Sequence, residues 1–381
     1  MQKRLIVLIP VYRPELEPLE VLSLTSIRKY CHAYPLYFLA SEGLRITHPS
    51  AQGIPYLYLP KEYFDGFAGY NRLMMSTLLY ERIAEYEFCL IAQLDVLLFH
   101  DKIEQFLDLP LDYIGALDEY VLPEFPKESV QCFALNGGLS LRRIQAFRTF
   151  LKAHAEEVAA WKGTEDSFFS LMGSRYPEEI RLASRKDCLS FSRNHYPRRY
   201  DVETHGQVPF GIHGFATFEP CFVRDFLRRL GSPWAESSAW DSECDVQLRQ
   251  QQAFHAFLSA KKPLFLYGAG AFGKIAATYL KLHHIPVEAF VVSDYQVQKN
   301  PRYVAELPII PISKIADKSA ACILFCISLR YKEKDIREIL PETLRENNGV
   351  EIFLMDYRLY NYMGESIWLS RHKGAVHGDE T

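Results

Sequence analysis

Apolar residues in the first 100 positions of the chain fall into short, regularly spaced runs that predict alternating strands and helices. Arg4–Pro10, Leu36–Leu39 and Phe88–Phe99 are apolar runs of the length that forms buried strands. Between them, Leu19–Tyr30 and Tyr70–Tyr86 place apolar residues at helical spacing. A strand-helix-strand-helix-strand order predicts a parallel sheet with helices on both faces, which is an α/β fold.

One position in this pattern breaks the apolar rule. The run Leu90–Phe99 contains a carboxylate, Asp95, among residues that are otherwise expected to be buried. A buried carboxylate without a partner is costly, so we expect Asp95 to be neutralised, paired or bound to a metal. The end of a central strand is where an α/β sheet opens to ligands. The alternative is an aspartate that only caps a turn.

A second series of strand and helix signals follows the Gln-rich, helix-like stretch Ser242–Ala260. The strand Pro263–Tyr267 leads into the glycine-rich turn Gly268–Gly273 and then a helix that ends near His283. Later elements are predicted at Val287–Ser293, Ala321–Ile327 and Val350–Met355 (strands) and at Lys332–Leu340 (helix). We therefore divide the chain into a first domain at 1–240, a helical linker at 241–261, a smaller α/β domain at 262–370 and a loose tail at 371–381.

The composition is that of an ordinary globular protein and disfavours several classes. The 381 residues are 48% apolar and 24% charged, with a formal net charge of -4. This charge gives no reason to expect binding to nucleic acid or to an anionic membrane. No apolar stretch has the length of a membrane span, and Leu5–Pro10 is too short for a signal segment, so we expect a cytoplasmic protein. The eight cysteines contain no Cys-x-x-Cys pair, which argues against a disulfide framework and a structural zinc site.

Four short motifs lie in the less regular stretch 113–214, the kind of region that builds the site in such folds. They are Tyr113–Ala116, Asn136–Arg142, Thr164–Phe169 and Pro209–Gly214. Each also has a plain structural interpretation. Asn-Gly-Gly can form a hairpin turn, Thr164 can cap a helix, and His213 can be a satisfied structural histidine.

In their order along the chain, these motifs resemble a bacterial family of glycosyltransferase-A-type domains found among genes for cell-surface polysaccharides. The resemblance covers residues 3–220 and rests on Ile9–Arg13, Gly69–Asn71, Gln93–Asp95, Tyr113–Ala116, Asn136–Arg142, Glu165–Asp166 and Pro209–His213. It implies a mixed, mostly parallel sheet and a hexosyltransferase-like enzyme. The implied reaction moves a sugar from a nucleotide-diphosphate donor to a surface-glycan or lipid-linked acceptor. The implied location is the cytoplasm, peripheral to the inner membrane.

The resemblance also implies a divalent ion, Mn²⁺ or Mg²⁺. A carboxylate-bound ion stabilises the diphosphate as it leaves the sugar. Enzymes of this fold usually hold the ion with Asp-x-Asp, whereas the matching triplet here is Gln93–Leu94–Asp95, with an amide in place of one carboxylate. Asp95 and His213 are the implied metal ligands. The alternative is that basic residues neutralise the phosphates.

An acidic pair matches the place of the catalytic base in similar inverting enzymes. The acceptor hydroxyl loses a proton as it attacks the anomeric carbon, and a nearby carboxylate takes that proton. Asp166, with Glu165 beside it, stands at the predicted start of a helix and matches this base. Transfer would then proceed with inversion, by single displacement. The alternative is that both acids only stabilise the helix dipole.

The turn Pro10–Arg13 follows the first strand, and in the resembled fold this turn lines the nucleotide pocket. Tyr12 is positioned to stack on the base, and Arg13 to meet a phosphate. The two glycines of Asn136–Arg142 allow the backbone to approach the donor sugar. The further predicted donor-binding residues are Asn71, Gln93, Asn136, Gly137, Gly138 and Arg142.

Gly268, Gly270 and Gly273 form a Gly-x-Gly-x-x-Gly turn between a predicted strand and helix. Asp294 ends the next strand about 20 residues later, as a dinucleotide-binding fingerprint requires. The unit resembles the small Rossmann-like domains appended to other sugar-modifying enzymes. There such a turn holds a nucleotide or nucleotide-sugar, or serves only assembly. The exposed edge of this unit would suit a homodimer.

Two other functions are compatible with these residues. Gln93 in place of an acid suggests a nucleotide-sugar-binding regulatory or scaffold protein that has lost catalysis. The glycine turn suggests an NAD(P)-dependent oxidoreductase, although no conspicuous hydride-transfer constellation accompanies it. The three hypotheses differ in which ligand binds and in whether a diphosphate is released.

Overall fold

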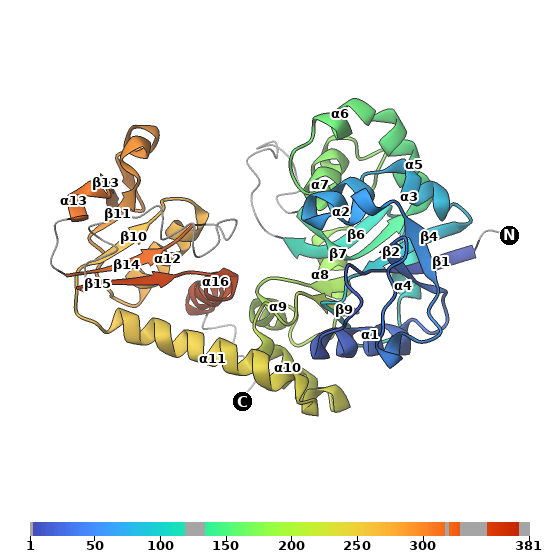
Figure 1. The fold of residues 1–381 in the computed structure, drawn as a ribbon, viewed down its shortest axis with the longest axis horizontal. Coiled ribbons are helices and arrows are strands. Elements are labelled where there is room, and N and C mark those ends of the chain that lie inside the picture. Colours follow the sequence, from blue (N-terminus) through green and yellow to red (C-terminus); the bar gives the residue numbers. More distant parts are fainter. Residues whose placement is uncertain (1–2, 119–133, 317–319, 328–348, 373–381) are drawn as a thin grey trace. The chain divides into compact units, whose positions relative to one another are not determined.

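The computed structural model describes residues 3–118, 134–316, 320–327 and 349–372, and it falls into two compact units (Figure 1). The first unit comprises Met1–Ala216 with Leu227–Ala239, and the second Thr217–Phe226 with Trp240–Thr381. Both are built on mostly parallel sheets flanked by helices. The predicted mixed, mostly parallel α/β class is thus confirmed.

The first unit has a six-stranded sheet in the order β3-β2-β1-β4-β7-β6. Strands β3, β2, β1 and β4 are parallel, β7 is antiparallel to β4, and β6 is antiparallel to β7. Because β1 has β2 on one side and β4 on the other, the winding direction changes there, and a ligand crevice is expected at the carboxyl ends of these strands. The strands are β1 (Lys3–Pro10), β2 (Leu36–Ser41), β3 (Tyr56–Leu59), β4 (Tyr86–Ala92), β6 (Tyr113–Asp118) and β7 (Ala134–Arg143).

A separate three-stranded sheet, in the order β5-β9-β8, adjoins the end of β4 in the chain. Val96 in β5 pairs with His213 in β9, and the Gly214 N–H donates to the Asp95 carbonyl at 2.9 Å. This pairing joins two segments that are far apart in sequence. The strands are β5 (Val96–Leu98), β8 (Ser192–Arg193) and β9 (Gly211–His213).

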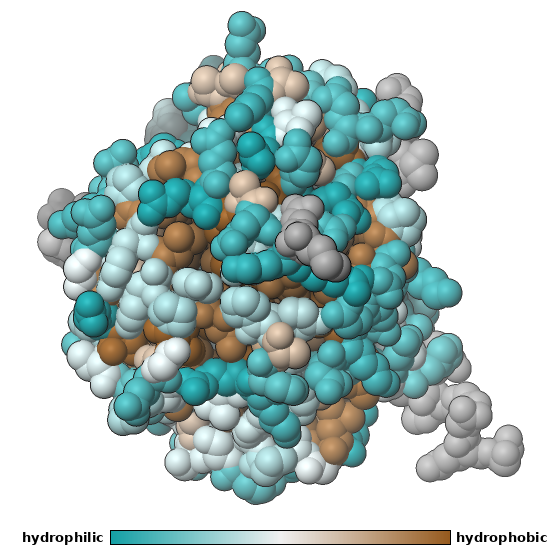
Figure 2. All heavy atoms as spheres, turned by 90° about the vertical axis from the view of Figure 1, so that its right-hand side faces the viewer, coloured by the Kyte–Doolittle hydropathy of each residue, from teal (hydrophilic) through white to brown (hydrophobic). Residues whose placement is uncertain are grey.

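Nine α-helices lie along the described part of the first unit before residue 216, and short 3-10 helices occur at Pro49–Ala51 and Lys61–Phe64. Apolar side chains of the sheet and helices form one continuous core, which includes Phe38, Phe88 and Phe147. The helices are α1 (Pro18–Tyr30), α2 (Gly66–Met74), α3 (Thr77–Arg82), α4 (Glu104–Leu107), α5 (Ile144–Ala153), α6 (Ala155–Ala160), α7 (Glu165–Arg175), α8 (Arg185–Phe191) and α9 (Pro197–Glu203). Figure 2 shows apolar atoms in the hollows of a surface that is otherwise mostly polar.

Two expectations for this unit are wrong, and one alternative interpretation is excluded. The run Leu90–Phe99 is not one strand, because β4 ends at Ala92 and a turn places Asp95 between β4 and β5. The helix expected over Tyr70–Tyr86 is two helices, since Ser76 interrupts it and caps α3 by accepting from the Leu78 N–H. Asn-Gly-Gly is not a hairpin turn but part of strand β7. Flanking apolar residues on both sides hid the first two breaks from the pattern.

The second unit has a six-stranded sheet in the order β12-β13-β11-β10-β14-β15, parallel except for β12. The three predicted strands that follow the glycine turn correspond to β11, β14 and β15, and the first strand to β10. The strands are β10 (Leu264–Tyr267), β11 (Ala289–Val292), β12 (Tyr303–Val304), β13 (Leu307–Pro311), β14 (Ala321–Phe325) and β15 (Val350–Leu354).

Helix α11 (Ala239–Leu258) occupies the Gln-rich stretch that was expected to be a helical linker, and the division into units groups most of it with the second unit. Helix α16 (Tyr357–Arg371) was not predicted. The helix expected at Lys332–Leu340 and most of the expected tail lie outside the described residues. The remaining helices are α10 (Pro220–Arg229), α12 (Ala271–Leu282) and α13 (Ser313–Ala316), with 3-10 helices at Pro233–Glu236 and Asp294–Lys299. Within the described ranges, no helix combines the length and apolar character needed to cross a membrane.

Candidate functional site

A cavity of about 520 Å³ opens at the carboxyl ends of β1 and β4, where the winding of the first sheet changes direction. Its walls come from the turn after β1, from the start of α1, from α2 and the segment before it, and from the turn after β4. This is where an open α/β sheet is expected to bind a ligand. Five residues predicted from the sequence line the cavity: Pro10, Tyr12, Arg13, Gln93 and Asp95.

Aromatic side chains form one wall of the cavity. The Tyr12 ring lies 6.2 Å from that of Phe64 and 6.4 Å from that of Tyr70, between ring centroids. Tyr12 is 46% exposed and Phe67, in the first turn of α2, is 70% exposed. Large aromatic side chains exposed beside a cavity favour the binding of a flat or apolar ligand surface, such as a nucleobase.

Arg13 lines the cavity, but acids on the same surface engage its guanidinium. Arg13 Nη2 lies 2.9 Å from both Glu17 Oε1 and Glu20 Oε2. The charged residues of the cavity lining are Arg13, Glu15, Glu20 and Asp95, three acids and one base. A polyphosphate in this cavity would therefore need a further cation.

Two residues of the cavity lining, Gln93 and Asp95, meet the side chain of His213 from β9. Asp95 Oδ1 lies 3.3 Å from His213 Nε2, and Gln93 Oε1 lies 3.2 Å from the same nitrogen. The other ring nitrogen, Nδ1, lies 3.0 Å from Asn194 Oδ1, which fixes the orientation of the ring. The pairing of β5 with β9 is what brings these residues together, because it places His213 directly opposite Val96.

The charges of Asp95 and His213 stabilise each other. Burial works to raise the pKa of Asp95, but the charge and hydrogen bond of His213 outweigh it and the pKa is lowered. Burial likewise works to lower the pKa of His213, but Asp95, with a contribution from Asp166, raises it above the ordinary value. Both predicted acidic positions, Asp95 and Asp166, thus contribute to the raised pKa of His213.

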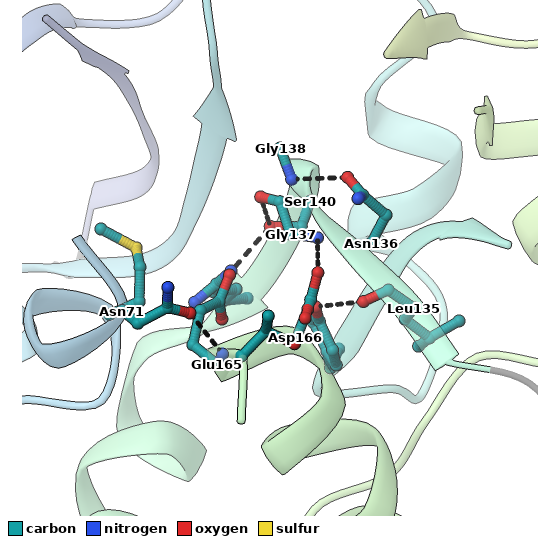
Figure 3. A network of polar contacts seen from close by, with 12 residues as sticks. Asn71, Leu135, Asn136, Gly137, Gly138, Ser140, Glu165 and Asp166 are labelled. Carbon is teal, nitrogen blue, oxygen red and sulfur yellow. Dashed lines mark hydrogen bonds and ion pairs between the residues drawn. The ribbon is translucent and has the colours of Figure 1, made fainter. Parts of the chain in front are cut away.

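The Gly137–Gly138 segment of β7 lies beside the acidic pair at the start of α7 (Figure 3), and it also approaches His213. A Cβ atom on Gly138 would lie 2.1 Å from His213 Nε2 and 2.7 Å from Gln93 Oε1. On the other side, the Gly137 N–H donates to Asp166 Oδ2 at 3.4 Å. Asn136 Oδ1 accepts from the Gly138 N–H at 2.9 Å, so this side chain holds the same segment. A larger residue at position 138 would displace the histidine.

Glu165 and Arg142 form a buried ion pair beneath this segment. Arg142 Nη2 lies 3.0 Å from Glu165 Oε1, and neither side chain is more than 3% exposed. Arg142 also donates to Ser140 Oγ at 3.1 Å, and Ser140 donates to the Gly137 carbonyl at 2.9 Å. Burial raises the pKa of Glu165 to about 7 against the lowering effect of Arg142. Both residues therefore support the Gly137–Gly138 segment from within the core, and Arg142 does not reach the solvent to meet a phosphate.

Asn71 also has a supporting place. Its Oδ1 accepts from the Glu165 backbone N–H at 2.6 Å, and its Nδ2 donates to the Phe67 carbonyl at 2.7 Å. Thr164 makes no capping hydrogen bond, so Asn71 of α2 caps α7 in its stead (Figure 3). Asn71 thus links the helix that carries the aromatic wall to the helix that carries Asp166. Its amide is occupied by these two bonds.

Among the cavity residues that were not predicted are two aromatic residues of α2. Phe67 and Tyr70 line the cavity from one face of α2, three positions apart. Two aromatic residues at helical spacing just before the predicted donor-binding residue Asn71 could have indicated an aromatic wall for the pocket. Asn194, which orients His213, gave no signal because its relation to the histidine depends on the pairing of β8 with β9.

The glycine turn of the second unit lies between β10 and α12, as predicted. Gly268 has a φ of +101°, and a Cβ atom on Gly273 would lie 2.0 Å from the Gly268 carbonyl oxygen. Gly270 faces open space, with no atom within 4 Å of an added Cβ. Asp294 follows β11, and its Oδ1 accepts from the Ser313 N–H at 3.2 Å. Close packing of the turn accounts for the first and third glycines without a ligand.

Comparison with known proteins places this chain near a family without an assigned function. The family described as "Protein of unknown function (DUF5672)" matches residues 53–213. No curated protein matches. A crystal structure of the galactosyltransferase LgtC with donor and acceptor sugar analogues is 12% identical, has a TM-score of 0.40, and aligns with 62% of this chain and 99% of that chain. An active-site mutant of LgtC gives the same identity and TM-score over 63% and 94%. A structure of RSP with β-NADH is 13% identical, with a TM-score of 0.19 over 40% and 82%.

Proposed function

We propose that the chain is a glycosyltransferase that moves a sugar from a nucleotide-diphosphate donor to a surface-glycan or lipid-linked acceptor. The observation that carries this proposal is the convergence, at the switch point of one sheet, of an aromatic-walled cavity, the Asp95–His213 pair and the Asp166 carboxylate. Each of the three supplies one requirement of sugar transfer from a nucleotide. The proposed setting is the cytoplasm, peripheral to a membrane that presents the acceptor.

The outer part of the cavity suits the nucleoside of the donor. Tyr12 and Phe67 expose aromatic rings there, and stacking of a base on an aromatic ring contributes about 1–3 kcal/mol. The cavity has room for a ligand of nucleotide size, since ligand pockets generally span about 300–1,000 Å³. The diphosphate would then extend toward Gln93 and Asp95.

The donor set around Asp95 suits a hard divalent ion. Asp95 Oδ1 is buried and, apart from its ion pair with His213, has no hydrogen-bond partner among the described residues. Its oxygen and the Gln93 amide oxygen are ligands that Mn²⁺ and Mg²⁺ accept. The His213 imidazole would join them only after losing the proton that Asp95 stabilises. Of the described residues, no three His, Cys, Asp or Glu side chains group to hold a metal, so the diphosphate would have to supply further ligands. A bound ion would neutralise the diphosphate that the acidic lining alone repels.

Asp166 is the proposed general base. Its side chain is half-buried at the first turn of α7, held by hydrogen bonds from the Gly137 N–H and the Ser167 N–H. A positioned carboxylate can accept the proton of the acceptor hydroxyl while that oxygen forms the bond to the anomeric carbon and the diphosphate leaves. Glu165 is not available for this step, because it is buried against Arg142.

Binding measurements test this proposal first. Calorimetric titrations would compare uridine, guanosine, cytidine and adenosine diphosphates, each with Mn²⁺ and with a chelator. We expect one of the four to bind, and to bind more tightly with Mn²⁺. Asp95→Asn should weaken the Mn²⁺-dependent binding about 10- to 100-fold, the loss typical of a disturbed metal site. Asp101→Asn, a change at an exposed residue outside the cavity lining, serves as the matched control and should bind like the wild type.

The outcomes separate the competing functions. No binding of any nucleoside diphosphate to the wild type would contradict the proposal. Equal binding with Mn²⁺ and with chelator would contradict the proposed metal ion and support nucleotide binding without it. Binding without release of the diphosphate in the presence of any glycan acceptor would favour the regulatory or scaffold alternative.

A further inference from the structure

The Tyr70 side chain has a hydroxyl proton that it does not donate to any described residue of the protein. Tyr70 is only 7% exposed, yet it lines the cavity, and its Oη atom donates no hydrogen bond to a described residue. Two other buried tyrosines of this unit donate within the protein: Tyr80 Oη donates to the Met74 carbonyl at 2.9 Å, and Tyr113 Oη to the Leu135 carbonyl at 2.8 Å. Leaving a buried hydroxyl proton without an acceptor is costly, so an acceptor outside the chain is the expected explanation.

The hydroxyl is kept in its neutral, donating form by its surroundings. Burial, followed by the negative charge of Glu165, raises the pKa of Tyr70 well above the ordinary value for a tyrosine. The charge of Arg142 and a hydrogen bond from the Gln93 side chain to the phenol oxygen work in the opposite direction, and neither uses the phenol proton. A protonated phenol in this position can donate one hydrogen bond into the cavity.

The charges nearby decide which kind of oxygen it would meet. Glu165 is among the groups that act on Tyr70, and the lining of the cavity carries three acids to one base. An anionic oxygen next to this hydroxyl would be repelled by these carboxylates, whereas the oxygen of a neutral alcohol would not. Ribose and a transferred hexose both present such alcohol groups.

We propose that Tyr70 Oη donates a hydrogen bond to an uncharged hydroxyl oxygen of the donor, either on its ribose or on the sugar to be transferred. This rests on the proposed function, because it takes the cavity to be the donor site. Tyr70 would then be a binding residue, and the nucleotide would satisfy a hydroxyl that the empty protein leaves buried.

The test uses Tyr70→Phe, which keeps the ring and its packing and removes only the hydroxyl. The probes are whichever of the four nucleoside diphosphates the wild type binds, its 2′,3′-dideoxy analogue and its glucose conjugate. We expect Tyr70→Phe to bind the hydroxyl-bearing probe about three- to tenfold more weakly, the loss of one neutral hydrogen bond. The unfolding temperature of the ligand-free variant should equal or exceed that of the wild type, because an unsatisfied group has been removed.

A matched control is Tyr58→Phe. Tyr58 Oη donates to the Leu44 carbonyl at 3.2 Å, and the residue does not line the cavity. This variant should lower the unfolding temperature and leave all binding unchanged, the reverse of the pattern expected for Tyr70→Phe.

The titrations with the different probes either identify the donor group that Tyr70 contacts or contradict the proposal. If the variant and the wild type bind the dideoxy analogue equally but differ for the ribonucleotide, the contact is to the ribose. A difference confined to the glucose conjugate places it on the sugar. An equal loss for every probe, the dideoxy analogue included, or no loss for any, overturns the proposal. A wild type that binds none of the probes refutes the proposed function itself, which is a distinct result.

Discussion

The two units carry a similar local feature, a turn at the carboxyl end of a central strand, yet the two turns use their polar groups differently. In the first unit, two buried atoms of the cavity keep hydrogen-bonding capacity that the described residues do not use: Tyr70 Oη donates no hydrogen bond, and Asp95 Oδ1 has only its ion pair with His213. In the second unit, the packing of Gly268 against Gly273 and the bond from the Ser313 N–H to Asp294 account for three of the four residues of the predicted dinucleotide-binding pattern. The glycine turn of the second unit thus has the stronger sequence motif but fewer unsatisfied hydrogen-bonding groups than the turns that line the cavity of the first unit.

This difference shows why a motif and a site are separate findings. The Gly-x-Gly-x-x-Gly spacing describes what backbone packing requires, and that requirement is met here within the protein. An unmet hydrogen bond, in contrast, requires a partner that the fold does not provide. We therefore expect ligand-dependent effects to be large in the first unit and small at the turn of the second.

The largest effect is expected at Asp166. Asp166→Asn keeps the size of the side chain and its ability to accept from the Gly137 N–H, but an amide cannot take a proton from an acceptor. Transfer should fall about 10²- to 10⁴-fold, the usual contribution of a general base. The measurement is release of nucleoside diphosphate from the nucleotide sugar that binds, with surface-glycan fragments as acceptors.

Glu156→Gln is the control for this experiment, because Glu156 is an exposed acid on α6, apart from the cavity lining. It should transfer at the wild-type rate. Donor binding should be the same in all three proteins. Unchanged transfer by Asp166→Asn would remove Asp166 from the role of base and leave the helix dipole as the reason for the acidic pair.

A smaller but still clear loss is expected at Gly138. The Cβ atom of Gly138→Ala would fall 2.1 Å from His213 Nε2, so the histidine must move away from Asp95 and Gln93. Overpacking of this kind costs about 1–3 kcal/mol of stability, and we expect Mn²⁺-dependent nucleotide binding to weaken about tenfold. Thermal unfolding and calorimetry on the same samples measure both. Wild-type binding by this variant would show that His213 does not hold the ligand.

Much of the fold was predictable because its signals are local. Apolar runs indicated β1, β2, β4 and the strands around the glycine turn, and their order indicated a parallel sheet. The break between β4 and β5 was not predictable, since Leu94 and Val96 continue the apolar pattern on both sides of Asp95. A turn without Gly or Pro gives a sequence pattern little to detect.

The candidate site was predictable only in part, for a different reason. Asp95 and His213 were both selected, and β9 pairing with β5 brings them to 3.3 Å. The roles of Arg142 and Asn71 depend on partners far away in sequence: Arg142 pairs with Glu165, and Asn71 caps α7. A charged or amide residue looks the same in a sequence whether it faces a ligand or a buried partner, so burial had to come from the structure.

The buried pair beneath the site should give a pH-dependent effect on stability. Burial raises the pKa of Glu165 to about 7, whereas an unfolded glutamate titrates near about 4.3. The unfolded chain therefore releases this proton first, and the contribution of Glu165 to stability falls as the pH rises from about 4 to about 7. Glu165→Gln cannot ionise at this position. Its free energy of unfolding, measured relative to that of the wild type, should therefore rise by about 1–3 kcal/mol as the pH increases from about 4 to about 7.

Urea unfolding of both proteins at several pH values between these limits measures the difference. Glu156→Gln again serves as the control and should follow the wild-type profile. Parallel profiles for Glu165→Gln and the wild type would mean that the Arg142 charge keeps Glu165 ionised throughout, and that the pair stabilises the site by charge rather than by packing.

The smallest effect is expected at Gly270, and it tests the comparison from the side of the second unit. Gly270 has a φ of -76°, which alanine also adopts, and an added Cβ would meet no atom within 4 Å. Gly270→Ala should change the free energy of unfolding by less than about 0.5 kcal/mol, as at an open surface position. Gly273→Ala, in the same turn, should destabilise the protein clearly, because its Cβ would lie 2.0 Å from the Gly268 carbonyl oxygen. If the turn also binds a dinucleotide, the wild type will alter NAD(P)H fluorescence, and Gly270→Leu will abolish that change by filling the open space. Such a result would place a second nucleotide site in this unit and undo the contrast with the first.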